Sequence, residues 1–149
     1  MRMIANHMRR HWVAWAIATA SALLTLAVYG ATLSFPFIFD DLIHLRWLAK
    51  RGVWDVWVNI EGMQHYRPLV MWLWAVSMRA FGATASWPLH LLTLALHIAN
   101  ACLVGWLARR VIPNAWAAIA AAAFFALYPF SYQAIPSPGS HSKPMRSEE

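Results

Sequence analysis

Two adjacent carboxylates, Asp40 and Asp41, are the side chains in this sequence best suited to acid–base chemistry. They come just after an apolar run long enough to cross a bilayer, so we expect them at a membrane surface. There a carboxylate pair can deprotonate an acceptor, or hold a divalent cation that neutralises a phosphate leaving group. One of the two can instead cap a helix that begins at Leu42. Both interpretations stay open, because two residues can divide the two roles.

A second candidate group, His65, Tyr66 and Arg67, stands directly before Pro68. Arg67 can grip a phosphate with its planar fork of N–H donors, and Tyr66 can stack on a substrate or donate a hydrogen bond to it. Pro68 predicts the start of a helix, because proline suits the first helical position. The alternative is a Tyr/Arg anchor at the lipid headgroups. The sequence therefore predicts either a substrate-binding group or an interfacial anchor here.

Polar residues also recur within the apolar segment 87–108. They stand at i, i+3, i+7 and i+10 and are predicted to share one helix face: His90, Thr93, His97 and Asn100. Such residues in a membrane helix face other helices or a cavity, so helix–helix hydrogen bonding is the alternative to a catalytic use. The two histidines are about 10 Å apart along the helix axis and cannot bind one metal by themselves. His90, nearer the outer end, is the candidate for substrate binding, and no metal ligand set is predicted.

The composition indicates what must position these residues. The 149 residues are 60% hydrophobic and 12% charged, with ten Trp, which indicates a membrane protein. The net charge of +6 comes largely from Arg residues that flank apolar segments, as at membrane boundaries. Nucleic acid is not an expected partner, because no basic run is interleaved with aromatic residues. The single cysteine, Cys102, lies in an apolar run and implies no disulfide.

Three apolar segments are predicted to span the membrane, over residues about 12–32, 87–108 and 115–130. The arginines at positions 2, 9 and 10 place the N-terminus in the cytoplasm. We interpret the first span as an uncleaved anchor rather than a signal peptide, because its 21 uncharged residues exceed a signal core and the cleavage pattern near Tyr29 is poor. The predicted fold is an all-α, multi-pass membrane domain over residues 1–136, with a polar, disordered tail over 137–149.

The first outer loop, residues 33–86, is predicted to hold two juxtamembrane helices. Leucines at helical spacing indicate an amphipathic helix over about 42–50, which Gly52 ends. The segment 68–81 is too short for a comfortable span and contains Arg79, so it is expected to lie at the surface or to be re-entrant. That placement leaves Arg109 and Arg110 on the cytoplasmic side.

The order of these features resembles the start of C-type (GT-C) membrane glycosyltransferases, and most nearly the relatives of protein O-mannosyltransferases. The motifs that carry the resemblance are Phe39-Asp40-Asp41, Tyr66-Arg67-Pro68-Leu69, Trp87-Pro88-Leu89-His90 and Phe124-Phe125-Ala126-Leu127-Tyr128-Pro129. The resemblance implies that the acidic pair is catalytic, with one residue activating the acceptor, and that the Tyr-Arg-Pro segment lies near the site. Many relatives have an acidic residue shortly after the proline that ends the third span, whereas this chain has Gln133 there. The family's enzymes are also several times longer than this chain.

The resemblance further implies transfer of a sugar from a polyprenyl-phosphate donor to an acceptor on the outer face of the membrane. We expect this membrane to be a bacterial inner membrane, and the acidic pair leaves open whether a divalent cation takes part. The chain is then expected to be an N-terminal fragment that is inactive alone and needs its missing C-terminal half or other membrane helices. The alternative is a small non-enzymatic membrane protein that packs against partner helices.

Overall fold

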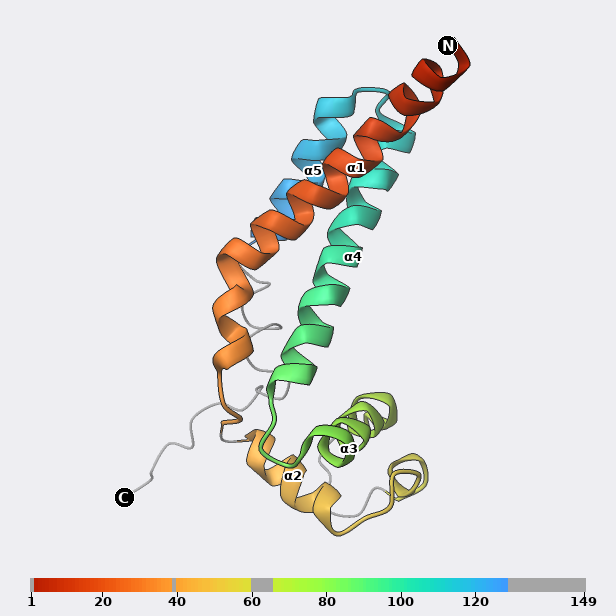
Figure 1. Cartoon of the computed structure of the whole chain (residues 1–149). Coiled ribbons are helices and arrows are strands. Elements are labelled where there is room, and N and C mark those ends of the chain that lie inside the picture. The colour runs from red at the N-terminus through yellow and green to blue at the C-terminus, as the bar shows by residue number, and fades with distance from the viewer. Residues whose placement is uncertain (1, 39, 60–65, 129–149) are drawn as a thin grey trace, which may run out of the picture.

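The computed structural model describes residues 2–38, 40–59 and 66–128, apart from the side chains of residues 2–10 and Asp40. Every regular element in these ranges is a helix, which confirms the predicted all-α class. The elements are α1 (Arg2–Tyr29), the 3₁₀ helix η1 (Gly30–Ser34), α2 (Asp40–Ala49), the 3₁₀ helix η2 (Asp55–Trp57), α3 (Pro68–Phe81), α4 (Trp87–Val111) and α5 (Ala115–Leu127). In Figure 1, α1, α4 and α5 form a long bundle, and α2 and α3 gather at one end of it. The predicted tail 137–149 lies outside the described residues.

Small side chains bring the three bundle helices close together. The small residues buried between them are Ser21 and Thr25 of α1, Ala101 and Gly105 of α4, and Ala118, Ala122 and Ala126 of α5. The closest approach is at Gly105, where an added Cβ would lie 2.9 Å from the Cβ of Ala122 and 2.9 Å from the Cγ2 of Ile17. Small residues that let backbones approach are typical of helix packing in lipid, where apolar burial gives little driving force.

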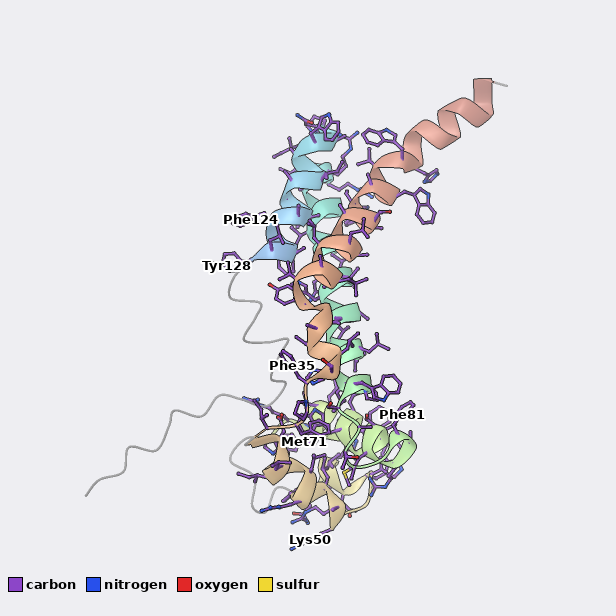
Figure 2. The ribbon with its side chains drawn as sticks, turned by 60° about the vertical axis from the view of Figure 1, so that its left-hand side comes forward. Phe35, Lys50, Met71, Phe81, Phe124 and Tyr128 are labelled. Atoms are coloured by element: carbon purple, nitrogen blue, oxygen red, sulfur yellow. The ribbon has the colours of Figure 1, made fainter. Side chains whose placement is uncertain are left out.

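Two helical stretches, His11–Ser34 and Trp87–Val111, are long and apolar enough to cross a membrane. Only 28% and 22% of their apolar windows are buried within the structure, whereas a core helix of a soluble protein is mostly buried. Large apolar side chains face outward on all three bundle helices, among them Leu23, Leu103 and Phe124. Figure 2 shows Phe124 pointing away from the bundle. These features are compatible with a bundle surrounded by lipid.

Aromatic side chains mark both ends of α4. At one end the guanidinium of Arg110 lies 4.5 Å from the centre of the Trp106 ring, and at the other the rings of Trp87 and Phe81 meet edge to face at 5.1 Å. Trp106 comes 19 positions after Trp87, which corresponds to about 28 Å of helix, close to the thickness of a hydrocarbon core. Tryptophan prefers the membrane–water boundary, so the two residues fit two interfaces.

The third predicted span, 115–130, is not confirmed. The helix α5 has 13 residues, about 20 Å, and ends at Leu127. Tyr128 is extended, with φ −60° and ψ 124°, because the residue before a proline is pushed out of the helical region. Residues 129 and 130 lie outside the described part of the chain. As it stands, α5 is shorter than a hydrocarbon core is thick.

The C-terminal end of α5 is held by polar side chains from the other two helices. The Nε2 atom of His97 on α4 lies 3.2 Å from the carbonyl oxygen of Ala126, and the Tyr29 hydroxyl on α1 donates to the carbonyl of Tyr128 at 3.5 Å. The His97 ring also stacks on Phe125 and meets Tyr29 edge to face. Because a carbonyl only accepts, the bound nitrogen of His97 carries the proton. Helix-terminal carbonyls that would otherwise lack partners are thus satisfied inside the bundle.

We expect His97→Phe to lower the free energy of unfolding by about 1–2 kcal/mol, because Phe keeps the ring contacts but leaves the buried Ala126 carbonyl without a donor. Thr93→Val is the control, since the Thr93 hydroxyl donates to Leu89 in its own helix and its loss should cost under about 0.5 kcal/mol. Denaturant titration in detergent micelles, followed by helical circular dichroism, gives both values. Equal stability of the two variants would contradict the capping role of His97.

A small cluster of α2, η2 and α3, here called the head, packs on the start of α4 (Figure 1). Its core contains Leu48 of α2, Val56 of η2, Met71 and Trp74 of α3, and Leu89 of α4. Local signals explain α3: Pro68 takes the first position, and Gly82, at φ 99°, ends the helix in a conformation that favours glycine. In Figure 2 Met71 lies inside the head and Lys50 at its far end.

Candidate functional site

The acidic pair lies at the start of α2. The Oδ2 atom of Asp41 accepts a hydrogen bond from the backbone N–H of Ile38 at 3.1 Å, and the Asp41 N–H donates to the Ile38 carbonyl at 2.9 Å. This reciprocal pair resembles one half of a capping box, in which an acidic residue of the first turn reaches back to an N–H before the helix. The Asp41 side chain is 2% exposed. Its geometry fits the capping role that the sequence left open for one of the pair.

Asp40 is the first residue of α2, and its side chain lies outside what the structure describes. His44, which the sequence did not indicate as a candidate, is four positions after Asp40, so the two share one side of α2. The His44 ring meets the Trp74 ring edge to face at 5.9 Å. The i, i+4 spacing of a carboxylate and an imidazole was the available sequence signal, and His44 joins the candidate residues.

The second predicted group is divided in the structure. His65 lies outside the described residues. The Tyr66 hydroxyl donates to the carbonyl of Trp57 at 2.7 Å, so it ties the residues that precede α3 to η2, while its side chain remains 58% exposed. Arg67 precedes α3, and its carbonyl accepts from the N–H of Met71 at 3.0 Å, while its side chain is exposed. The Arg67 side chain is thus accessible at the surface of the head.

Two other cations of the head make structural contacts. The Arg79 guanidinium donates to the carbonyls of Ala75 at 3.2 Å and Arg51 at 2.5 Å. It therefore joins α3 to the end of α2, where carbonyl groups lack partners in the helix. The Arg51 guanidinium lies 4.3 Å from the centre of the Trp47 ring. Both residues stabilise the head that carries the acidic pair.

His90 lies in the first turn of α4 and is 2% exposed. Neither ring nitrogen has a hydrogen-bond partner among the described residues. The turn is anchored by Ser86, whose hydroxyl donates to the Phe35 carbonyl at 2.6 Å and so ties α4 to the loop that leads to α2. Figure 2 places Phe35 at this junction of bundle and head. A substrate could reach the His90 imidazole only if the groups that enclose it moved.

The predicted shared face of four polar residues on α4 is wrong for Asn100. His90 and His97 are buried, but Asn100 is exposed, and the half-buried Thr93 donates to its own helix. Asn100 comes ten residues after His90. At 100° per residue, this spacing rotates Asn100 about 80° around the helix axis from His90. The buried stripe of α4 follows instead His90, Leu94, His97, Ala101 and Gly105.

Metal ligands do not gather in the described residues: no group of three or more His, Cys, Asp or Glu side chains there could hold a metal ion. Asp55, another acidic residue of the head, accepts from the Gly52 N–H at 2.6 Å and stabilises a turn.

Over 127 residues the chain is 33% identical to the Protein O-mannosyl-transferase Tmtc2 of Drosophila melanogaster. The similarity is to a glycosyltransferase. It covers 75% of this chain but 13% of Tmtc2, so the chain spans only a small part of the length of this relative. No family model matches the chain, and no solved structure matches it.

Proposed function

We propose that this chain is the N-terminal part of a GT-C-type membrane glycosyltransferase that moves a sugar from a polyprenyl-phosphate donor to an acceptor on the outer face of a bacterial inner membrane. The main support is the 33% identity to Tmtc2, which is named a protein O-mannosyl-transferase. The fold is compatible with it, because two membrane-length helices carry a small head with an acidic pair at its edge. The chain covers 13% of that relative, so we propose that it does not transfer sugar by itself.

The geometry suggests different roles for Asp40 and Asp41. Asp41 is buried and holds the start of α2 through the Ile38 N–H. In our proposal this contact orients the first turn, so that Asp40 takes the proton from the acceptor hydroxyl as general base. The attacking oxygen then bonds to the anomeric carbon of the sugar, while the polyprenyl phosphate leaves with the electrons of the broken C–O bond. Arg67 and His65 are the proposed contacts of that phosphate, with Tyr66 beside them.

The test begins with the genomic DNA downstream of the codon for Glu149, translated in three frames. We expect one frame to encode several further membrane-length apolar segments. Joining that frame to residues 1–149 gives what we call the completed enzyme, which should transfer sugar from a polyprenyl-phosphate donor in vesicles, whereas residues 1–149 alone should not. Transfer by the chain alone would disprove its dependence on a second part, and a downstream region without such segments would disprove the fragment proposal.

The proposed orientation has a separate test in intact cells. In a Cys102→Ala background, Pro113→Cys, in the turn between α4 and α5, should be shielded from a membrane-impermeant thiol reagent because it faces the cytoplasm. Lys50→Cys, at the far end of the head, should react because it faces outward. Permeabilised cells provide the control, since both cysteines are exposed in the structure and should then react. Labelling of Pro113→Cys in intact cells would show that the orientation is the opposite of the proposed one.

A further inference from the structure

The outward side of α4 carries a regular stripe that the bundle leaves uncovered. We define the α4 outer stripe as Leu96, Asn100, Leu103 and Leu107, which recur at spacings of four, three and four residues. The leucines are 55%, 61% and 59% exposed, and Asn100 is exposed as well. This spacing is that of the contact positions in paired parallel helices. The α4 outer stripe therefore has the pattern of a helix–helix contact.

Contact with lipid alone would be energetically unfavourable for the α4 outer stripe, because the stripe contains Asn100. It lies 13 residues after Trp87 and six before Trp106, so it is inside the length that the two aromatic residues bracket. Its carboxamide has no hydrogen-bond partner among the described residues. A polar amide in hydrocarbon without a partner is strongly unfavourable. A hydrogen-bond partner from outside the described residues would remove this cost.

We propose that the partner is a second copy of this chain, with two parallel α4 helices in contact along the α4 outer stripe and their Asn100 side chains hydrogen-bonded to each other. A carboxamide carries both donors and an acceptor, so it complements itself. A two-fold axis along the membrane normal places the two amides at the same depth without any further requirement. A single Asn among apolar contact positions also fixes the register of two helices.

The residues next to the α4 outer stripe do not prevent this pairing by charge repulsion or by size. Arg110, one turn beyond Leu107, could bring like charges together, but its guanidinium lies over the ring of Trp106, on the flank of the stripe. Ala99, beside Asn100, is small and exposed, which lets the two backbones approach closely. This inference needs the membrane placement of α4 but not the sugar transfer, so its failure would leave the proposed function standing.

The test uses the full chain in lipid vesicles with Cys102→Ala as background. Leu103→Cys should form a disulfide-linked dimer on mild oxidation, whereas Phe124→Cys, which is 71% exposed but on α5, should not. Asn100→Leu should weaken dimerisation about 3- to 30-fold in energy-transfer measurements at varied protein-to-lipid ratio, and Asn100→Gln should largely restore it. Circular dichroism of each variant shows that the bundle is retained.

Three outcomes would overturn the proposal: equal cross-linking at Leu103 and Phe124, undiminished dimerisation of Asn100→Leu, or a chain that stays monomeric at every ratio. In cells, cross-linking of Leu103→Cys to a different protein in place of its own copy would also overturn it, and would assign the α4 outer stripe to another membrane helix.

Discussion

Asp40→Asn should lower the rate of sugar transfer by the completed enzyme by about 100- to 10,000-fold, because an amide cannot take the acceptor proton. Asp41→Asn should lower it by at most about 10-fold, since the Asn oxygen can still accept from the Ile38 N–H and hold the start of α2. Initial rates at saturating donor, measured in vesicles of constant composition, give both values. The two neighbouring substitutions thereby separate the proton acceptor from the capping residue.

Asp55→Asn is the matched control for both variants. Its carboxylate also accepts a backbone N–H three residues earlier, that of Gly52, but it is exposed and has no proposed catalytic role. Its activity should stay within about twofold of the parent. If Asp41→Asn lost as much activity as Asp40→Asn while the helical signal stayed unchanged, both carboxylates would be catalytic and our division of roles would be wrong.

Gly105→Ala should destabilise the bundle by about 1–3 kcal/mol, although alanine is the better helix former. The added methyl group would lie 2.9 Å from the side chains of both Ile17 and Ala122, and 3.2 Å from the Ala118 carbonyl oxygen. These neighbours are a short side chain, a β-branched one and backbone, so none can move aside without shifting a helix. Gly105→Val should be more damaging still. Denaturant titration in micelles measures the loss.

Gly30→Ala is the same chemical change at a position where the new Cβ would meet nothing within 4 Å. It should leave stability unchanged or raise it by up to about 1 kcal/mol, because alanine restricts the unfolded chain. Comparable losses at Gly30 and Gly105 would show that the close approach of α1, α4 and α5 is not what limits stability.

Local sequence signals account for much of the helical layout but not for its ends inside the bundle. A proline and a glycine bracket α3, and an acidic residue begins α2. The apolar run of the second span stops at Ala108, yet α4 continues to Val111. Arg109 and Arg110 interrupt the apolar run, but their backbones can still make helical hydrogen bonds. The third span, predicted over 115–130, is not confirmed: hydropathy continues past Leu127, but α5 ends there because the backbone leaves the helix before the proline.

The site shows the same limit. A pattern can say that Asp40 or Asp41 caps a helix, but only three-dimensional contacts show that Asp41 is buried and accepts the Ile38 N–H. The phase of α4 depends on α1 and α5, which lie far away in the sequence, so periodicity alone could not separate the buried His97 from the exposed Asn100. Likewise, the Tyr29 hydroxyl donates to the carbonyl of Tyr128, 99 residues later, and no local motif predicts this contact.

The way α5 ends has a consequence for the biogenesis of the protein. In the proposed membrane placement α5 is too short to cross alone, and the groups that satisfy its last carbonyls, Tyr29 and His97, belong to helices made earlier on the ribosome. A separate α5 leaving the translocon would carry those carbonyls into lipid without partners. We therefore expect α5 to enter the membrane stably only after α1 and α4 have paired. On this expectation, the order of membrane integration follows the order of synthesis.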